Sequence, residues 1–383
     1  MRTKPIKNEL TKSLKGEKFY NPNTFNAVDA TICYIVILIA FFALGFTAIP
    51  VKYVCTKVLK NTVFNDYFFM MIVMSFISQG AIAGVAAIFY RVKRVNAFSG
   101  GGYNFNTNFT DAVSAVILVL GVGLCFSPLH TEFFEYMTAV FGDLGLEIPE
   151  SVIEKSNPVF VYFYGAVVVP VFPAVCEELL FRGVIMRGMS ERGLFYGAIT
   201  SSLMFAFMHG SVGMIILQFL VGLTIAAVVM ITKNHIYGSI MHCAYNLLLS
   251  VLSALPDIAG EIAKDASGMT GGAMIIIGVI FLITGGLYYI NKYFKKRENE
   301  IKGIKTEPSK FEKVPLICYS TINESDLCVK LPYYTDDKDI RSRKDTLFFY
   351  RNGFVPYNKN SIGILPTVLF IVGMIAAIVF MFI

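Results

Sequence analysis

The sequence contains no tryptophan, only four histidines and few charged residues, since Asp, Glu, Lys and Arg together make up 16% of its 383 residues. A soluble globular domain usually contains about 25% charged residues. Apolar residues make up 55% of the chain, and the mean hydropathy is +0.61. This composition excludes an ordinary soluble enzyme and a disordered protein, and it predicts a polytopic helical membrane protein.

Cysteine pairs with metal-ligand spacing are also missing. The seven cysteines form no CxxC motif, and most of them lie in or beside apolar runs. We therefore expect reduced cysteines that pack as small apolar residues, which excludes a disulfide-stapled secreted domain and a cysteine zinc site.

Nine apolar stretches have about the ~20 residues that a helix needs to cross the hydrocarbon core of a bilayer. They are residues 31–51, 67–90, 112–129, 159–187, 194–209, 212–232, 236–255, 271–290 and 362–382. Because every backbone polar group must be satisfied within the chain in lipid, these stretches should be helices. The expected fold class is all-α, a polytopic transmembrane helical bundle of about 8–9 spans with a small cytoplasmic segment before the last span.

Basic residues predict the orientation of these spans. Of 33 Lys and Arg residues, 21 fall in residues 1–27 and 292–360. Nucleic-acid binding is one interpretation of such basic stretches, but retention on the cytoplasmic side explains them better. We expect a multi-pass protein of the plasma membrane with a cytoplasmic N-terminus, in which the loop carrying Arg187 is also cytoplasmic.

The expected organisation has four parts. They are a basic cytoplasmic tail (1–28), a transmembrane bundle (29–291), a basic cytoplasmic segment (292–360) and a C-terminal transmembrane helix (361–383). Within the bundle, residues 130–158 are expected to form an outward loop whose acidic and aromatic pattern allows an interfacial helix.

Ionisable residues within spans are costly and mark candidate functional sites. The fourth span contains two adjacent carboxylates, Glu177 and Glu178. Glu178 and Arg182 are four residues apart and share a helix face, where they can form an ion pair. Glu177 has no such partner on its own helix, so a general-base role is open to it. Pro170 and Pro173 precede it and should kink the helix and free backbone carbonyl groups.

Two further patterns follow in later spans. Phe205 and His209 close the fifth span, and His242 and Asn246 lie on one face of the seventh. An imidazole and a carboxamide on one face can bind an oxyanion or a metal. Taken singly, each pattern has a structural alternative, such as an ion pair that packs helices or a histidine bonded to a backbone carbonyl.

The other polar residues of the spans are interpreted structurally. His130 and His235 fall at loop edges and are expected to be solvated. Gln79 and Gln218 are expected to form hydrogen bonds between helices. Asp111 is expected to mark the boundary of a span.

Depth within the bilayer poses a difficulty for a site that uses all three patterns. At ~1.5 Å per residue, Glu177 lies ~15 Å from the inner end of its span, whereas His209 lies ~22 Å from the inner end of the fifth. His242 lies ~9 Å from the inner end of its own span. The three can meet only if the fifth span begins further in than residue 194, or if the site lies at the base of a deep cytoplasmic cavity.

In their order on successive spans, Glu-Glu-x-x-x-Arg, Phe-x-x-x-His and His-x-x-x-Asn resemble the motifs of the CAAX-protease and bacteriocin-processing family of intramembrane proteases. That family includes the type II CAAX prenyl endopeptidases and many bacterial members named Abi proteins. The resemblance covers about residues 159–250, the expected catalytic core. It implies an endopeptidase in which Glu177 and His209 activate a water molecule, while His242 and Asn246 stabilise the oxyanion.

The resemblance gives the remaining motif residues supporting roles. Glu178 and Arg182 would hold the site together, and Phe205 would pack beside it. Members are often described as metalloproteases, but the sequence has no HExxH motif. Two histidines and a carboxylate can work with or without a metal, and we favour a metal-free glutamate mechanism, with zinc as the alternative.

The expected partners are a peptide or membrane-anchored protein substrate and the lipid bilayer, with no nucleic acid and no particular oligomeric state indicated. Two functions of other classes remain open. One is a non-catalytic bacteriocin self-immunity or peptide-binding membrane protein. The other is a transporter with a buried proton relay, although the chain lacks the internal repeats that are typical of transporters.

Overall fold

The computed structural model describes residues 25–58, 60, 62–93, 102–103, 105, 107–143, 157–190, 193–254, 269–301 and 364–380. Throughout these residues the regular structure is helical and no strand occurs, as the sequence predicted. Two basic parts of the chain lie outside the described residues. They are the tail up to residue 24 and most of the basic segment, residues 302–363.

The first half of the described chain contains α2 (Ala27–Gly45), α3 (Ala48–Tyr53), two short turns at Val54–Val58 and Thr62–Asn65, α4 (Tyr67–Val92) and α5 (Phe109–Asp143). A helix of several parts follows: α6 (Pro158–Phe163), η3 (Tyr164–Val168), α7 (Val169–Leu180), η4 (Phe181–Met186) and α8 (Arg187–Met189). The chain continues with α9 (Leu194–Met208), α10 (Ile215–Thr232), α11 (His235–Ala254), α13 (Met269–Ile301) and α17 (Ile364–Phe380).

Each of the nine apolar stretches corresponds to a described helix or to a run of consecutive helices. Six described helices are long and apolar enough to cross a membrane, and the apolar parts of α9 and α17 are shorter. A polytopic helical bundle is therefore confirmed. The third candidate span ends at Leu129, as predicted, but the helix α5 itself continues through Pro128 to Asp143, across part of the stretch that was expected to be a loop. A proline costs one helical hydrogen bond but can be accommodated in a transmembrane helix.

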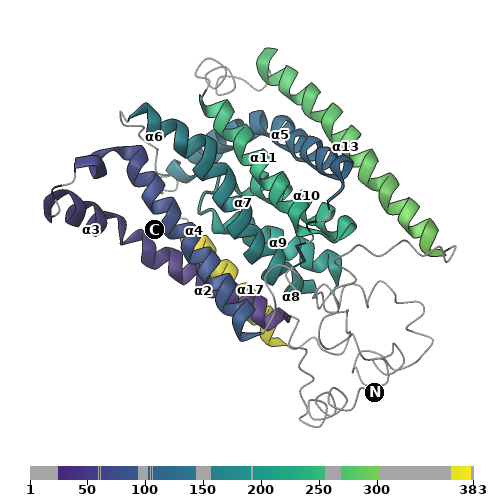
Figure 1. The fold of residues 1–383 in the computed structure, drawn as a ribbon, viewed down its shortest axis with the longest axis horizontal. Coiled ribbons are helices and arrows are strands. Elements are labelled where there is room, and N and C mark those ends of the chain that lie inside the picture. The colour runs from purple at the N-terminus through teal and green to yellow at the C-terminus, as the bar shows by residue number, and fades with distance from the viewer. Residues whose placement is uncertain are drawn as a thin grey trace, which may run out of the picture.

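The helix that contains α7 lies at the centre of the bundle (Figure 1). On one side, α7 packs against α4, and on the other side it packs against α11. The outermost pairs are α13 with α5 and α17 with α2. As a result, α7 lies between two neighbouring helices, and its polar side chains face the interior of the bundle.

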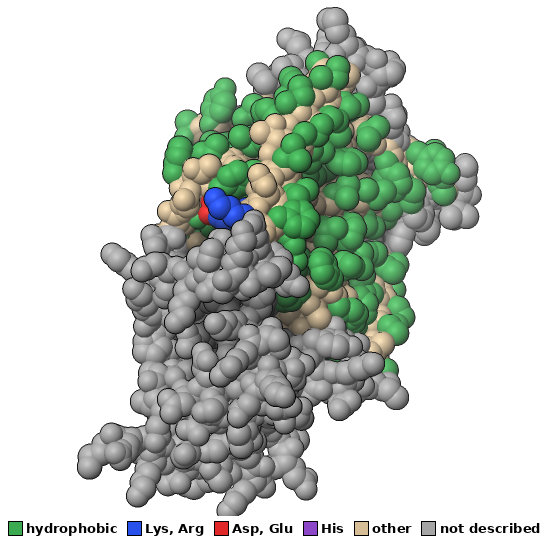
Figure 2. Space-filling model, turned by 90° about the vertical axis from the view of Figure 1, so that its right-hand side faces the viewer, with side chains coloured by type: hydrophobic (Ala, Val, Ile, Leu, Met, Phe, Trp, Pro, Cys, Tyr) green, Lys and Arg blue, Asp and Glu red, His purple; other side chains and the backbone are tan. Residues whose placement is uncertain are grey.

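The outer surface of the bundle is apolar. Figure 2 shows a face that is almost entirely hydrophobic over the part of the chain that the structure describes. On α13, Ile276, Ile280, Ile283 and Leu287 are all more than half exposed. A helix that presents such a surface is suited to contact with lipid chains.

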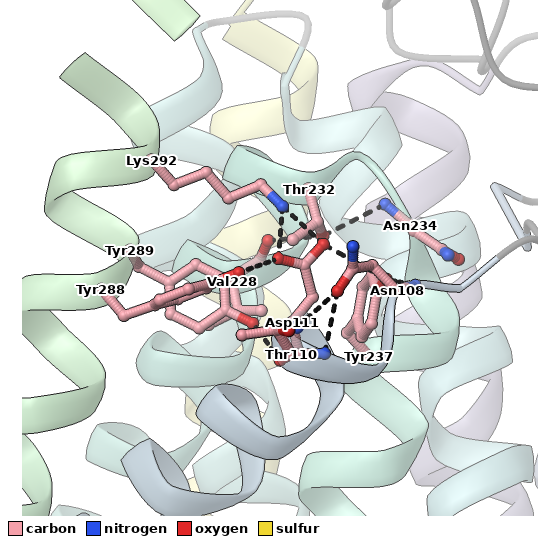
Figure 3. Close-up of polar contacts among 10 residues, drawn as sticks. All are labelled: Asn108, Thr110, Asp111, Val228, Thr232, Asn234, Tyr237, Tyr288, Tyr289 and Lys292. Carbon is pink, nitrogen blue, oxygen red and sulfur yellow. Dashed lines mark hydrogen bonds and ion pairs between the residues drawn. The ribbon is translucent and has the colours of Figure 1, made fainter. Parts of the chain in front are cut away.

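Asp111 joins three helices at one end of the bundle (Figure 3). Its carboxylate accepts hydrogen bonds from the hydroxyl groups of Tyr288 (2.7 Å) and Tyr237 (3.3 Å), and it pairs with Lys292. The hydroxyl of Tyr289 donates to the backbone carbonyl of Asp111 at 2.7 Å. Asp111 is buried, so it does more than mark the boundary of a span: it connects α5 with α11 and α13.

We predict that Asp111→Asn lowers the free energy of unfolding by about 1–2 kcal/mol, because a neutral amide cannot pair with Lys292 and accepts weaker hydrogen bonds from the tyrosines. Thermal unfolding of the purified protein in detergent measures the effect. In a double-mutant cycle with Lys292→Met, the two losses should not add. Fully additive losses would show that the ion pair does not stabilise the bundle.

Candidate active site

Pro173 changes the hydrogen bonding of the helix that carries the paired carboxylates. Turns of π-helix, η3 and η4, flank α7, and such turns occur frequently at functional sites. In an α-helix, the N–H of residue 173 would donate to the carbonyl of Val169, but Pro173 has no N–H. The side chain of Asn246 on α11 donates to that carbonyl instead, at 3.1 Å. The free carbonyl that the sequence predicted therefore becomes a contact between α7 and α11.

Glu178 is completely buried and binds two cationic or imidazole groups through one oxygen. Its Oε1 accepts a hydrogen bond from Arg182 Nη1 at 2.8 Å and lies 3.0 Å from His242 Nδ1. The predicted ion pair between residues four apart is thus confirmed. Arg182 also donates from Nη2 to the carbonyl of Gly222 on α10, at 2.9 Å. Through these contacts, Glu178 links α7 to α10 and α11.

Glu177 faces a different set of neighbours. Its Oε1 accepts a hydrogen bond from Nε2 of Gln79 on α4, at 2.9 Å. Its Oε2 lies 3.8 Å from Nε2 of His242 and has no hydrogen-bond partner among the described residues. Glu177 has no partner on its own helix, as predicted, and its neighbours come from α4 and α11. Gln79 was expected to bond between helices, which the structure confirms, but a single sequence did not indicate its partner.

His209 stands at the end of α9 because the next residue is Gly210, whose positive φ of 64° ends the helix. The ring atom Nδ1 of His209 lies 2.8 Å from the carbonyl oxygen of Phe205. His209 is exposed, whereas His242 is buried. The ring of Phe205 connects the two histidines, since it packs against both His209 and His242.

The Phe205 ring contacts the other side chains of the site. Its centroid lies 4.7 Å from that of His209 and 5.5 Å from that of His242. The guanidinium carbon of Arg182 lies 5.0 Å from the same centroid, in the range of a cation–π contact. Phe205 therefore holds the rings of two histidines and the Arg182 side chain in place, as a residue packed beside the site should.

A glycine allows α11 to approach the carboxylates. A Cβ atom at Gly238 would lie 2.9 Å from Oε2 of Glu178, closer than such contacts normally occur. Gly238 precedes His242 by four residues and so lies on the same helix face. The close approach of α11 at this glycine brings the His242 ring within reach of Glu178.

All seven residues singled out from the sequence lie in this region of contact between α7, α9, α10 and α11, and Gln79 adds α4. The depth conflict is smaller than the sequence suggested, because the helix that contains Glu177 ends at Met189. By the same ~1.5 Å per residue, Glu177 lies ~18 Å from that end and His209 ~22 Å from the start of α9. Between these two residues the remaining difference is small. His242 lies only ~10 Å from the start of α11 and still reaches Glu178 at 3.0 Å, so α11 starts at a different depth from the other two helix ends.

Two residues assigned to the solvent are buried. His235 is 0% exposed, and its ring packs against Tyr103 with centroids 5.7 Å apart. Burial raises the pKa of the Tyr103 hydroxyl well above its ordinary value. Arg187, assigned to a cytoplasmic loop, is also 0% exposed, and its guanidinium carbon lies 5.5 Å from the ring centroid of Phe25. Both predictions failed because long-range packing covers the helix ends that the sequence places at the surface.

The residues of this site do not form a metal-binding cluster. Among the described residues, no three His, Cys, Asp or Glu side chains are grouped so that they could hold a metal ion. We therefore assign no step of the chemistry to a metal.

Comparison with known proteins finds a family model that matches the part of the chain that contains this site. Residues 158–248 match the sequence model of the family described as Type II CAAX prenyl endopeptidase Rce1-like. Neither the curated proteins nor the solved structures that were compared with the chain gave a match. The matched residues run from the start of α6 into α11 and include both carboxylates, both histidines and Asn246. This part of the chain is therefore similar to the CAAX prenyl endopeptidases, which confirms the resemblance predicted from the three motifs.

Proposed function

We propose that the protein is an intramembrane endopeptidase that hydrolyses a peptide bond of a membrane-associated peptide or protein. The observation that carries this proposal is the 3.8 Å approach of Glu177 Oε2 to His242 Nε2, beside a Phe205 ring that packs against both His242 and the exposed His209, within the segment that matches a family of endopeptidases. A carboxylate with one free oxygen beside an imidazole can take and return protons.

In the proposed reaction, the oxygen of a water molecule attacks the carbonyl carbon of the peptide bond. At the same time Oε2 of Glu177 takes a proton from that water, and His209 assists this transfer. The carbonyl oxygen becomes an oxyanion. Breakdown of the tetrahedral intermediate breaks the C–N bond, and the proton returns from Glu177 to the leaving nitrogen. Water is thus divided between a new carboxyl group and a new amine, and no other reactant is needed.

His242 and Asn246 are suited to binding the oxyanion. When Nδ1 of His242 donates to Glu178, its Nε2 is the ring atom that faces Glu177, and in a doubly protonated ring Nε2 would donate to the oxyanion. Asn246 uses one N–H on the carbonyl of Val169 and keeps a second N–H. Donors fixed before the reaction are effective because they need no reorganisation as charge develops.

We propose that the protein lies in the plasma membrane, with its N-terminus on the cytoplasmic side. The concentration of Lys and Arg in residues 1–27 and 292–360 supports that orientation. With this orientation, the ends of the helices that join at Asp111 also face the cytoplasm.

The proposal is tested by a quantitative survey of peptide termini in host membranes and medium. Cells carrying the wild-type protein are compared with cells carrying Glu177→Ala at equal abundance. Termini that depend on Glu177 would establish proteolysis and identify the substrate. Identical termini, with the wild-type phenotype retained by Glu177→Ala, would overturn the proposal and favour a peptide-binding or immunity protein.

A further inference from the structure

We infer that Gln79 is a positioning residue for Glu177, although it lies on α4 and outside the residues that match the family model. Its amide nitrogen holds one oxygen of Glu177, so that the other oxygen faces His242 and the attacking water. The catalytic part of this inference rests on the proposed endopeptidase function, whereas the hydrogen bond itself does not.

The first step of the argument is the asymmetry of the Glu177 carboxylate. Oε1 accepts from Gln79 at 2.9 Å, and Oε2 has no hydrogen bond among the described residues. Oε2 is the oxygen nearer to His242, at 3.8 Å from Nε2. A carboxylate held by one oxygen cannot rotate freely, so its other oxygen keeps a fixed direction toward the histidine.

The second step concerns the other end of the Gln79 amide. The side chain is nine-tenths buried, and its Oε1 is a buried acceptor without a hydrogen-bond partner in the described part of the chain. A buried acceptor usually has a donor, because leaving it unsatisfied is costly. The two O–H bonds of the attacking water would supply donors to Oε1 of Gln79 and Oε2 of Glu177, which would direct the oxygen lone pair toward the substrate carbonyl.

A purely structural hydrogen bond between α4 and α7 is the alternative. The two roles differ in what they predict. A structural bond contributes to stability, so its loss lowers the folded population without changing the rate per folded molecule. A positioning bond changes that rate and leaves the amount of folded protein nearly the same.

The test uses Gln79→Met, which nearly preserves side-chain volume but removes both the donor and the acceptor. Ser78→Ala is the control, since the hydroxyl of Ser78 donates to the carbonyl of Ser75 within the same helix. Both full-length variants are compared with wild type at equal abundance. The first readout is the amount of the Glu177-dependent peptide termini, normalised to folded protein.

We expect Gln79→Met to reduce these termini about 10- to 100-fold, the effect of losing a hydrogen bond to a charged group. Ser78→Ala should leave them unchanged. If Gln79→Met, folded to the wild-type extent, produced termini at the wild-type level, the inference would be overturned.

A second readout does not depend on activity. Infrared difference spectra between wild type and Glu177→Gln isolate the carboxylate stretching band of Glu177. We expect Gln79→Met to shift this band and Ser78→Ala to leave it in place. An unshifted band would disprove the hydrogen bond. A shifted band in a protein that yields no Glu177-dependent termini would support the contact but overturn the endopeptidase proposal, so the two failures can be told apart.

Discussion

Glu177→Gln is expected to lower the cleavage rate of the purified protein by about 10²- to 10⁴-fold, the usual contribution of a general base. Glutamine has nearly the same shape as glutamate, and its carbonyl oxygen can still accept the hydrogen bond from Gln79. The variant should therefore fold normally, and the loss should appear in the rate at saturating substrate. The measurement is hydrolysis of the peptide that the survey of termini identifies, after reconstitution into lipid vesicles.

His209 provides the matched comparison for that prediction. If Glu177 and His209 activate the same water, His209→Asn should also be strongly impaired, and the double variant should be little worse than Glu177→Gln alone. Groups that act as a unit show such non-additive losses. A Glu177→Gln protein that keeps more than about one tenth of the wild-type rate would rule out the general-base role, because the loss would fall below the range for such a group.

Much of this fold was predictable because lipid leaves the chain few choices. An apolar run in a bilayer has to satisfy its own backbone, so each of the nine stretches corresponds to helical structure. The ends of the helices were less predictable. α5 continues past Pro128 to Asp143, and α13 extends to Ile301, because a helix can continue beyond its apolar run, and hydropathy marks the end of the run and not the end of the helix.

The site was predictable to the extent that it depends on spacing within one helix. The contact of Glu178 with Arg182 follows from their four-residue separation, and so does the shared face of His242 and Asn246. Contacts between helices could not be derived in this way. Nothing near Gln79 in the sequence indicates that it reaches a carboxylate 98 residues away.

The same limit explains why burial was misjudged at some helix ends. A histidine or arginine beside a loop is usually solvated, and hydropathy alone supports that interpretation. In the structure, the ring of Tyr103 lies against His235, and that of Phe25 lies against Arg187. Phe25 and Tyr103 are far in the sequence from the side chains that they cover. The burial of those side chains therefore depends on the tertiary structure, which the sequence alone does not show.

Arg182→Met is expected to cost about 3–5 kcal/mol of the free energy of unfolding, the typical effect of removing one partner of a buried ion pair. Arg182 is 1% exposed and Glu178 is 0% exposed, so water cannot replace the lost guanidinium. The hydrogen bond from Arg182 to the carbonyl of Gly222 on α10 would be lost as well. Thermal unfolding in detergent, followed at constant protein concentration, measures the loss.

The second-site variant Glu178→Gln separates the cost of an uncompensated charge from the loss of packing. In the double variant Arg182→Met with Glu178→Gln, no isolated charge remains in the core, so most of the stability should return. The recovery should be incomplete, since the hydrogen bond from Arg182 to the carbonyl of Gly222 on α10 is still missing. Activity should stay low in the double variant, because His242 no longer has a carboxylate to orient its ring and Phe205 no longer has the guanidinium against its face. A double variant as unstable as Arg182→Met would show that Arg182 stabilises the bundle through packing and its bond to α10, and not by neutralising Glu178.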